Sequence, residues 1–450
     1  MNYRDTIFAL SSAWGAAGVA VVRVSGSQAF AGMKSLIPSA SPLPRQAQFL
    51  RLSDPRDNHL IDQGVVLCFP GPASFTGEDV VEYQIHGGMA VIRDLLQVLG
   101  ALPGHRLAEA GEFTRRAFEN GKMDLTAAEG IADLIHAETE AQKAQALSQI
   151  GGALSDLYEG WGARLKRIMA HLEADIDFPD EDLPEGVLAS ARPALTGLLQ
   201  ELREHLDDNR RGERLRDGVQ VVVIGAPNVG KSSLVNALAQ RDVAIVSEHA
   251  GTTRDLIETH LNIGGFPVIL VDTAGLRPEE IGSDGQEGIE SEGIRRALQR
   301  AEAADIRVLV FDALSLPSLD CHTLRLLDQN SLVVFNKTDA PCSDIPVIAK
   351  GRQVEVSVKT GRGLEQFIAM LGQMIASLIG NRETPSLTRV RHRTALEECA
   401  SALARGLGAA LPELMAEDVR MALRALGRIT GRVDVEDVLD VIFHDFCIGK

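Results

Sequence analysis

The chain has 450 residues, which is enough for about two to four domains that each bury their own core. It carries 62 acidic and 45 basic residues, and the formal net charge of −17 argues against a broad basic face for a nucleic acid, so any RNA substrate must meet a local patch or a more basic partner. The cysteines are scattered without a C-x-x-C pair, which argues against a metal site or a disulfide framework and indicates a reducing, cytoplasmic setting: Cys68, Cys321, Cys342, Cys399 and Cys447.

Residues 1–120 have the pattern of an α/β domain. Apolar runs predict three strands and one helix, at Ile7–Leu10, Val19–Val24, Gly64–Phe69 and Val91–Leu99. The stretch Ile7–Val22 is also apolar enough to suggest a signal peptide, but Asp5 and the interrupting Ser and Gly residues favour two buried strands. No apolar run reaches the roughly 18 to 20 residues of a membrane span, so we expect no membrane partner.

Residues 121–215 change to a helical pattern. Thr126 and Glu129 form a capping box that predicts the start of a helix. A near-heptad apolar stripe then predicts helix packing, through Leu154, Leu157, Trp161, Leu165, Ile168 and Leu172. The acidic run from Asp175 to Asp182 favours a solvated turn over a metal site, because it lacks the spacing of a calcium loop. A helix at about 188–208 ends in the basic link Arg210–Arg214, which we interpret as a hinge first and an RNA contact second.

The stretch Gly225-Ala226-Pro227-Asn228-Val229-Gly230-Lys231-Ser232-Ser233 follows the apolar run Val219–Ile224 and precedes a helical pattern. Its glycines let backbone N–H groups approach phosphate oxygens beside a helix N-terminus. Lys231 adds a charge for the β- and γ-phosphates, and Ser232 offers a hydroxyl to Mg²⁺. The spacing predicts a P-loop.

Residues 216–378 alternate strands and helices as a doubly wound sheet does. Asp272-Thr273-Ala274-Gly275 follows a strand-like run, where Asp272 can hold the water shell of Mg²⁺ and the Gly275 N–H can sense a γ-phosphate. Leu276 stands where many small GTPases carry Gln, so another group must orient the attacking water.

Two further motifs predict the base that is bound. Asn336-Lys337-Thr338-Asp339 ends the run Leu332–Phe335, and the Asp339 carboxylate can accept both the ring N–H and the exocyclic amine of guanine. Ser357-Val358-Lys359 would place a backbone N–H on the guanine oxygen. The nucleotide is therefore predicted to be GTP. After residue 378 the pattern is helical again, and we expect the helices on both sides of the G domain to form one domain, because each group alone is too short of core.

From end to end the chain resembles the tRNA modification GTPase MnmE (TrmE) family. Besides the P-loop, the resemblance rests on Ala250-Gly251-Thr252-Thr253-Arg254-Asp255, Ser74-Phe75-Thr76-Gly77-Glu78-Asp79, His86-Gly87-Gly88 and the terminal Cys447-Ile448-Gly449-Lys450. It implies a multidomain α/β plus α fold: a folate-binding N-terminal domain that dimerises (1–120), a discontinuous helical domain (121–215 and 379–450) and an inserted Ras-like P-loop GTPase domain (216–378).

The resemblance also implies a K⁺-activated GTPase whose two G domains meet across the nucleotides, with K⁺ standing where other GTPases place an arginine finger. K⁺ would bind Asn228, Ser247, His249 and Thr252, and Mg²⁺ would bind Ser232 and Thr253. Glu290 matches the glutamate that positions water, with Glu287 and Glu292 as rivals because Pro278–Ile289 looks longer than the family's usual switch. Lys231 is the second catalytic residue. The GTP-binding positions implied are Asn228, Val229, Gly230, Lys231, Ser232, Ser233, Ser247, Glu248, His249, Ala250, Gly251, Thr252, Thr253, Asp272, Thr273, Ala274, Gly275, Asn336, Lys337, Asp339, Ser357, Val358 and Lys359.

By the same matching, Arg23, Glu82, Lys122 and Lys450 would contact a 5-formyl- or methylene-tetrahydrofolate, with Cys447 nearby. Without the family the four are ordinary surface charges, and Cys447 is an unreactive residue of a packed tail unless its pKa is lowered. The implied function is the addition of an aminomethyl or carboxymethylaminomethyl group at C5 of the tRNA wobble uridine, jointly with the FAD-dependent partner MnmG. GTP hydrolysis would open and close the G domains, and tRNA would be bound mainly through the complex.

Two other functions share part of this pattern. A ribosome-assembly GTPase of the Era or Der type has the same G motifs and the Thr252-Thr253 switch, but it needs a basic RNA-binding domain, and we find no K-homology signature and no second P-loop. A binding module that uses GTP only as a structural switch would show negligible turnover. Replacing Glu290 by alanine separates that module from an enzyme, since hydrolysis collapses only in an enzyme that uses this residue.

Overall fold

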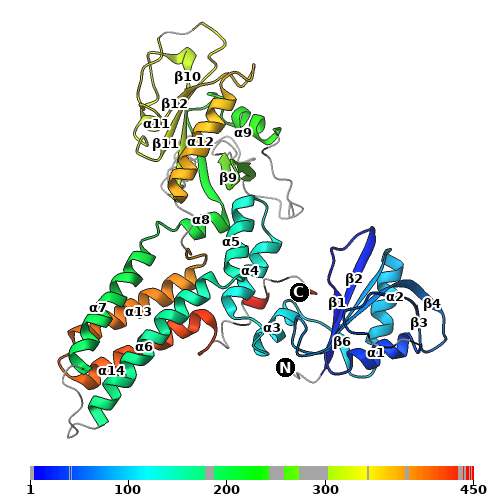
Figure 1. The fold of residues 1–450 in the computed structure, drawn as a ribbon. Helices are drawn as coiled ribbons and strands as arrows, with labels where there is room; N and C mark the ends of the chain where they lie inside the picture. The colour runs from blue at the N-terminus through cyan, green and yellow to red at the C-terminus, as the bar shows by residue number, and fades with distance from the viewer. Residues whose placement is uncertain are drawn as a thin grey trace, which may run out of the picture. The chain divides into compact units, whose positions relative to one another are not determined.

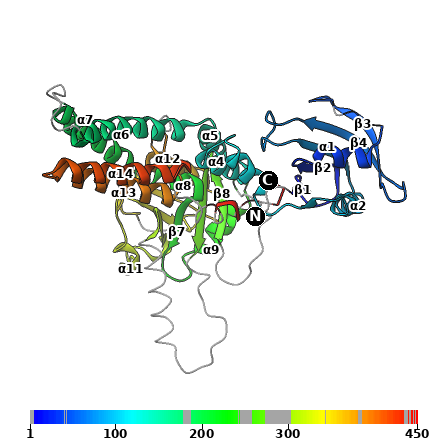
Figure 2. The same cartoon turned by 90° about the horizontal axis from the view of Figure 1, so that it is seen from below.

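The computed structural model of the protein describes residues 5–39, 41, 43–177, 187–241, 243, 258–272, 303–341, 344–380, 385–433, 439, 442–444, 446 and 448–449. The chain divides into two compact units (Figure 1; Figure 2). Unit 1 comprises Met1–Ala132, Ile150–Arg167 and Val419–Lys450, and unit 2 comprises Asp133–Gln149 and Ile168–Asp418. Within the described residues, each unit builds a six-stranded sheet.

The sheet of unit 1 has the strand order β3-β4-β5-β2-β1-β6, and all neighbours are antiparallel except β1 and β6. The strands are β1 (Thr6–Leu10), β2 (Ala17–Ser25), β3 (Gln48–Ser53), β4 (Leu60–Phe69), β5 (Val80–Gly87) and β6 (His105–Leu107). Helices α1 (Ala29–Leu36) and α2 (Met89–Gly100) pack on one face (Figure 1). The predicted strands β1, β2 and β4 and the predicted helix α2 are confirmed, whereas β3, β5, β6 and α1 were not predicted.

Strand β1 is buried on both faces of this sheet, which explains its continuous apolar sequence. Phe8 and Leu10 contact the core under α1 and α2, and Ile7 and Ala9 contact a second cluster with Phe113. Cross-strand partners point to the same face. Because Arg23 of β2 stands opposite Ala9 in register, its side chain lies on the face away from α1 and α2.

The first helices after the sheet are α3 (Glu112–Glu119), α4 (Leu125–Ile135), α5 (Glu140–Ile150) and α6 (Ala153–Asp177). The predicted capping box at Thr126 and Glu129 is wrong. Asp124 caps α4 instead, since its Oδ1 accepts the Ala127 N–H at 2.8 Å and the Thr126 hydroxyl at 2.9 Å. The apolar stripe of α6 is confirmed by the buried Leu154, Trp161, Leu165, Ile168 and Leu172, but Tyr158 is buried where Leu157 was expected.

The sheet of unit 2 has the order β12-β11-β10-β7-β9-β8, and only β8 is antiparallel to its neighbour. Its strands are β7 (Val219–Ile224), β8 (Glu258–Ile263), β9 (Phe266–Asp272), β10 (Ile306–Asp312), β11 (Ser331–Asn336) and β12 (Gln353–Glu355). One face packs on α9 (Lys231–Ala239) and α12 (Leu364–Ile379), and the other packs on the segment around α11 (Cys321–Leu324). The expected sheet with elements on both faces is confirmed.

The helices that flank this sheet in sequence are α7 (Val187–Leu206), α8 (Arg211–Asp217), α13 (Val390–Gly408) and α14 (Pro412–Thr430). Helices α7 and α13 lie side by side, and Arg192 of α7 donates to the carbonyl oxygens of Leu407 and Ala409 at 2.7 and 2.9 Å. The basic link predicted as a hinge is helical and packed. A Cβ at Gly212 would lie 2.2 Å from the Leu387 carbonyl oxygen, so the segments before β7 and after α12 touch.

No helix in the described part of the chain is long and apolar enough to cross a membrane.

Candidate functional site

Two positions of the loop between β7 and α9 have room only for glycine, because a Cβ there would clash with neighbouring atoms. A Cβ at Gly225 would lie 2.3 Å from the carbonyl oxygen of Val310, and a Cβ at Gly230 would lie 2.2 Å from Asn336 Nδ2. Asn228 and Gly230 also have positive φ values of 64° and 98°. Ser232 and Ser233 are exposed in the first turn of α9. The loop is therefore a backbone cradle at a helix N-terminus, which fits a polyphosphate.

The Lys231 side chain lies against this loop. Lys231 is only 8% exposed, and its ammonium donates hydrogen bonds to the carbonyl oxygens of Gly225 and Ala226 at 2.9 and 3.0 Å. The positive charge is thus held beside the backbone that would receive the phosphates.

The predicted guanine motifs lie beside the same loop. Asn336, which is 3% exposed, donates from Nδ2 to the Val229 carbonyl oxygen at 2.9 Å and accepts the Val358 N–H at 3.3 Å. The Ser357 hydroxyl donates to Asp339 Oδ1 at 2.8 Å, and this hydrogen bond holds the pKa of Asp339 below its usual range. An ionised Asp339 is the acceptor that a guanine edge requires.

The carboxyl ends of β7, β9, β11 and β12 therefore carry the P-loop, Asp272, the segment Asn336–Asp339 and the segment Ser357–Lys359. Asp272 is 2% exposed and stands opposite Val223 of β7. Lys359 is exposed. The remaining predicted positions lie outside the described residues: Ser247, Glu248, His249, Ala250, Gly251, Thr252, Thr253, Thr273, Ala274, Gly275, Glu287, Glu290, Glu292, Cys447 and Lys450.

A second polar site lies in unit 1, around Arg23. Its guanidinium bonds Glu82 Oε1 through two nitrogens at 3.0 and 2.9 Å, and both side chains are less than one-fifth exposed, at 17% and 19%. The guanidinium carbon lies 5.3 Å from the ring centre of Phe75 and 5.8 Å from that of Phe113. The two rings and the carboxylate hold the guanidinium in one orientation.

The third described residue of the predicted folate set, Lys122, borders the segment that carries Phe75. Its Nζ donates to the Pro72 carbonyl oxygen at 2.9 Å, and Asn120 donates to the Thr76 carbonyl oxygen at 2.7 Å. Gly449 lies next to the residue that follows β1, because the Ser11 hydroxyl donates to the Gly449 carbonyl oxygen at 2.9 Å. The structure thus brings Arg23, Glu82 and Lys122 around one segment.

Three residues at these sites were missed from the sequence. Phe75 and Phe113 flank Arg23, and Asp312 lies 2.6 Å from Lys337 Nζ. A signal existed for Asp312, which is a carboxylate directly after the buried run Ile306–Phe311 at the carboxyl edge of a parallel sheet. Phe75 lies in the motif Ser74-Phe75-Thr76-Gly77-Glu78-Asp79 that supported the resemblance, although no contact with Arg23 was predicted for it, and no signal marks Phe113.

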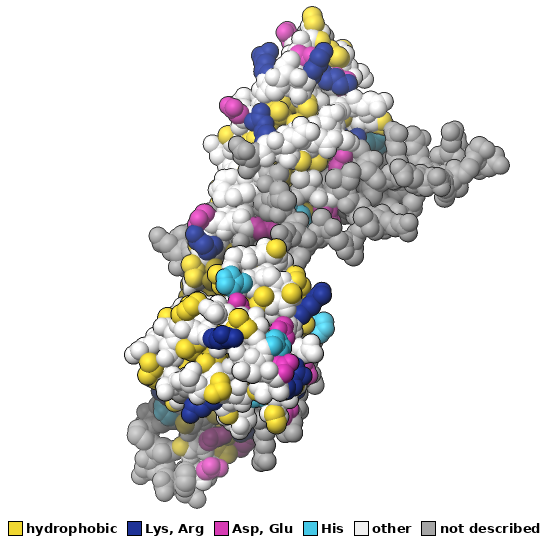
Figure 3. All heavy atoms as spheres, turned by 90° about the vertical axis from the view of Figure 1, so that its right-hand side faces the viewer, with side chains coloured by type: hydrophobic (Ala, Val, Ile, Leu, Met, Phe, Trp, Pro, Cys, Tyr) yellow, Lys and Arg dark blue, Asp and Glu magenta, His cyan; other side chains and the backbone are white. Residues whose placement is uncertain are grey.

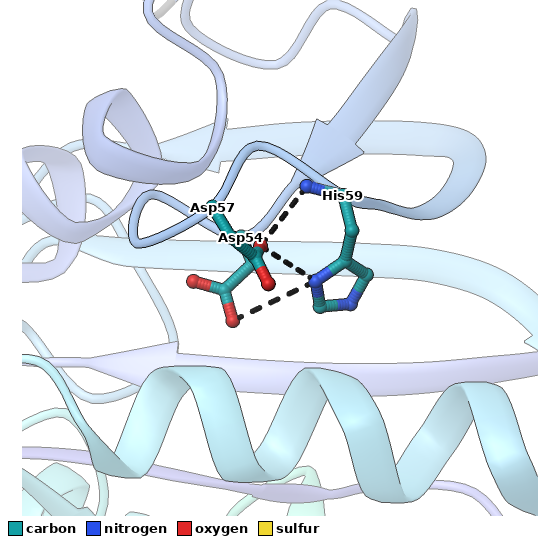
Figure 4. Close-up of side chains that lie close together, drawn as sticks. All are labelled: Asp54, Asp57 and His59. Atoms are coloured by element: carbon teal, nitrogen blue, oxygen red, sulfur yellow. Dashed lines mark hydrogen bonds and ion pairs between the residues drawn. The ribbon is translucent and has the colours of Figure 1, made fainter.

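Asp54, Asp57 and His59 in the β3–β4 turn lie close enough to share a metal ion (Figure 4). Their polar atoms are already engaged. Arg56 bonds both oxygens of Asp54 and lowers its pKa to about 2. The two ring nitrogens of His59 bond Asp57 at 2.8 Å and Asp94 of α2 at 2.9 Å. A ring with both nitrogens bonded to carboxylates is an imidazolium without a free lone pair, so this cluster is an ion-pair network that ties the turn to α2.

We expect His59 to titrate well above an ordinary histidine. The hydrogen bonds to Asp94 and then to Asp57 raise the pKa of His59 from 6.5 to about 8. Because the folded pKa exceeds the unfolded one, the stabilisation by the charged ring is complete below pH 6.5 and is lost as the pH rises through 8. An NMR titration of the His59 ring protons measures this pKa, and replacing Asp94 by asparagine lowers it. A wild-type pKa near 6.5 would contradict the network.

Comparison with known proteins accounts for the whole chain. Residues 6–122 match the family described as the GTP-binding protein TrmE N-terminus, and residues 125–447 match the MnmE helical domain. The tRNA modification GTPase MnmE of Parvibaculum lavamentivorans is 53% identical over 450 residues, and that of Paramagnetospirillum magneticum is 52% identical, each alignment covering 99% of this chain and 100% of the relative. The mitochondrial GTPB3 subunit of a 5-taurinomethyluridine-tRNA synthase of Danio rerio is 47% identical over 481 residues, covering 99% of this chain and 93% of that protein. Because two family models and relatives at about half identity match it almost from end to end, the chain belongs to the MnmE family of tRNA modification GTPases.

Proposed function

We propose that this chain is a K⁺-activated GTPase that helps to add an aminomethyl or carboxymethylaminomethyl group at C5 of the wobble uridine in tRNA. The observation that carries the proposal is the full-length similarity to tRNA modification GTPases at 53% and 52% identity. The Danio rerio relative is named for 5-taurinomethyluridine, a uridine substituted at C5, which supports this position of the base.

In the nucleotide site, Asp339 would accept the guanine N–H donors, and the Val358 N–H would reach the guanine oxygen. Lys231 would bind the β- and γ-phosphates. Mg²⁺ would be held by Ser232 and Thr253, with Asp272 on its water shell, and would offset phosphate charge. The buried, preorganised Lys231 and the glycine-lined cradle support this assignment.

The K⁺ site is proposed at Asn228, Ser247, His249 and Thr252, where oxygen ligands, including the backbone carbonyl oxygen of His249, suit a hard cation. K⁺ would offset the charge that develops on the phosphates as two G domains meet. Glu290 would orient the attacking water, with Glu287 and Glu292 as the alternatives. The left-handed backbone at Asn228, a conformation that asparagine tolerates well, places this residue in the turn of the P-loop.

In unit 1, Arg23, Glu82, Lys122 and Lys450 would bind a 5-formyl- or methylene-tetrahydrofolate that supplies the one-carbon unit. Arg23 and Lys122 complement the carboxylates of a folate, and Glu82 can accept N–H donors of a pterin ring. The orientation of Arg23 between two aromatic rings supports this site. Cys447 would lie near the folate. The redox chemistry would come from FAD on the partner MnmG.

We propose three parts in a cytoplasmic homodimer: a folate-binding domain (1–120), a helical domain (121–215 and 379–450) and an inserted G domain (216–378). Dimerisation through residues 1–120 is supported by apolar side chains exposed there, among them Trp14 at 63%, Val19 at 57% and Phe49 at 70%. Figure 3 shows hydrophobic side chains (yellow) among charged ones on the face of the molecule that it turns toward the viewer. Because the net charge is −17, tRNA would be bound mainly through the complex.

Nucleoside mass spectrometry of tRNA from cells that lack this gene tests the proposal. We expect the C5-substituted wobble uridines to disappear, to return with the wild-type gene and to stay absent with Glu290→Ala. In vitro, Glu290→Ala should keep nucleotide binding and lose hydrolysis by about 100-fold or more. If the modified uridines persist while unassembled ribosomal subunits accumulate, the function is that of an assembly GTPase.

A further inference from the structure

Asp312 is the last residue of β10 and stands next to Asn336, the last residue of β11, in the parallel register. Its side chain is 15% exposed and has two partners. Oδ2 lies 2.6 Å from Lys337 Nζ, and Oδ1 accepts the Leu314 N–H at 3.0 Å at the start of the short helix Ala313–Ser315. The carboxylate therefore joins a helix cap to a lysine of the guanine motif.

Lys337 connects Asp312 to the P-loop. Its Nζ also donates to the carbonyl oxygen of Asn228 at 2.9 Å, while Asn336 Nδ2 donates to the next carbonyl oxygen, that of Val229. Lys337 and Asn228 both have positive φ values, 67° and 64°. Asparagine tolerates such a backbone, but it is unfavourable for lysine and persists at Lys337 where neighbouring groups fix it. Asn336 and Lys337 together hold two successive carbonyl groups of the P-loop.

Because the peptide bond is planar, the positions of these two carbonyl groups also determine where the neighbouring N–H groups point. In a trans peptide the C=O and the following N–H point in opposite directions. Holding the carbonyl oxygens of residues 228 and 229 on the side of β11 therefore directs the N–H groups of Val229 and Gly230 to the other side. Successive N–H groups that point the same way form an anion-binding nest.

We propose that Asp312 is a positioning residue for GTP hydrolysis, which acts through Lys337 on the peptide between Asn228 and Val229. It contacts neither phosphate nor base. By keeping the ammonium of Lys337 over the Asn228 carbonyl oxygen, it keeps the phosphate nest formed. It also fixes the backbone that carries the Asn228 side chain, which is a proposed K⁺ ligand. The expected effect of Asp312 on K⁺ binding therefore rests on the function proposed above.

Asp312→Asn is the informative variant in the full-length protein, because asparagine can still accept the Leu314 N–H but brings no charge to Lys337. We expect the dissociation rate of a fluorescent GDP to rise by about 10-fold, the factor that follows from losing one hydrogen bond to a charged group. The K⁺ concentration for half-maximal GTPase activity should rise as well, and the melting temperature should stay near that of the wild type. Asp312→Glu, which restores the charge, should recover part of the slow dissociation.

Asp320→Asn is the matched control. Asp320 caps α11 in the same way, accepting the Thr323 N–H at 2.8 Å, and among the described residues it has no hydrogen bond to the P-loop. If Asp312→Asn releases GDP no faster than Asp320→Asn, Asp312 is only a helix cap and the proposal is overturned. If Asp312→Asn does not fold, Asp312→Ser, another uncharged cap, gives the same comparison. A wild-type protein without K⁺ activation would refute the K⁺ part of the proposed function, whereas the GDP measurement would still decide on Asp312.

Discussion

Replacing Lys231 by alanine is expected to lower the rate of GTP hydrolysis at saturating GTP by about 10² to 10³-fold, because that is the cost of removing one preorganised charge-stabilising donor from an active site. The lysine is 8% exposed and is already fixed by the carbonyl oxygens of Gly225 and Ala226, so little reorganisation precedes its use. Its loss also leaves the phosphate cradle without its buried cation, which should weaken the binding of GTP and GDP. Phosphate release and the binding of a fluorescent nucleotide measure the two effects.

Two variants show whether the loss is specific to this position. Lys350 is exposed in the same unit, and Lys350→Ala should hydrolyse GTP like the wild type. Lys231→Arg keeps the positive charge but replaces a compact ammonium by a wide planar guanidinium, so it should remain strongly impaired. Hydrolysis by Lys231→Ala within about fivefold of the wild type, in a protein with an unchanged melting temperature, would remove Lys231 from the catalytic residues.

Two of the strands that sequence alone predicted, β1 and β7, are buried along almost their whole length, whereas the predicted β2 and β4 alternate buried with more exposed residues. β1 and β7 are continuous apolar runs because each is covered from two sides. β3 was missed because its pattern is weak, with Phe49 exposed on an edge strand. β5 alternates buried Val81, Tyr83 and Ile85 with more exposed neighbours, which is a strand signal that was overlooked. α1 begins without a side-chain cap, so no start signal was present.

The residues of the candidate sites also divide into those that the sequence could predict and those that it could not. The P-loop and the guanine motif were predictable because each is a short run at the end of one strand. The contact of Asp312 with Lys337 depends on the register of β10 against β11, and sequence does not state that register. The same holds for Phe75 and Phe113 around Arg23, since three separate segments meet there. Contacts between residues that are far apart in the sequence could be identified only from the structure.

Arg116→Met is expected to destabilise unit 1 by about 3 kcal/mol at pH 7, the lower end of the cost of breaking a buried ion pair, because Glu112 keeps a second partner in Arg106. The Arg116 and Glu112 side chains are each 2% exposed and bond at 2.9 Å. Arg116 also donates to both oxygens of Glu78, at 3.2 and 3.1 Å. The buried charges of Arg116 and Glu112 stabilise the fold only when they are paired. Methionine at position 116 removes one of the hydrogen-bond donors to the Glu112 carboxylate.

Urea unfolding followed by tryptophan fluorescence isolates this effect, because both tryptophans of the chain, Trp14 and Trp161, lie in unit 1. The matched control is Arg115→Met. Arg115 is the neighbouring residue of α3, and its ion pair with Glu119 is more exposed, so its loss should cost about 1 kcal/mol or less. Equal losses for the two variants would contradict a buried pair.

The pH dependence gives the Arg116 prediction a second test. Burial alone would raise the pKa of Glu112, but hydrogen bonds from Arg106, the Glu109 N–H and Arg116 outweigh it and the pKa is lowered from 4.5. The stabilisation by the ionised pair is therefore present above pH 4.5 and is lost as the pH falls through the folded pKa. The difference between wild type and Arg116→Met should be largest near pH 7 and should shrink in acid.

The Arg116→Met substitution should also affect the site around Arg23. Glu78, one of the Arg116 partners, also accepts the Ser25 hydroxyl at 2.7 Å, and its backbone N–H bonds the Thr76 hydroxyl at 3.2 Å. Arg116 therefore supports the segment that places Phe75 against the Arg23 guanidinium. If unit 1 binds folate as proposed above, Arg116→Met should weaken the binding of 5-formyltetrahydrofolate while GTP hydrolysis stays unchanged, and Arg115→Met should alter neither. If folate binds Arg116→Met as tightly as it binds the wild type, the buried pair stabilises unit 1 without shaping that site.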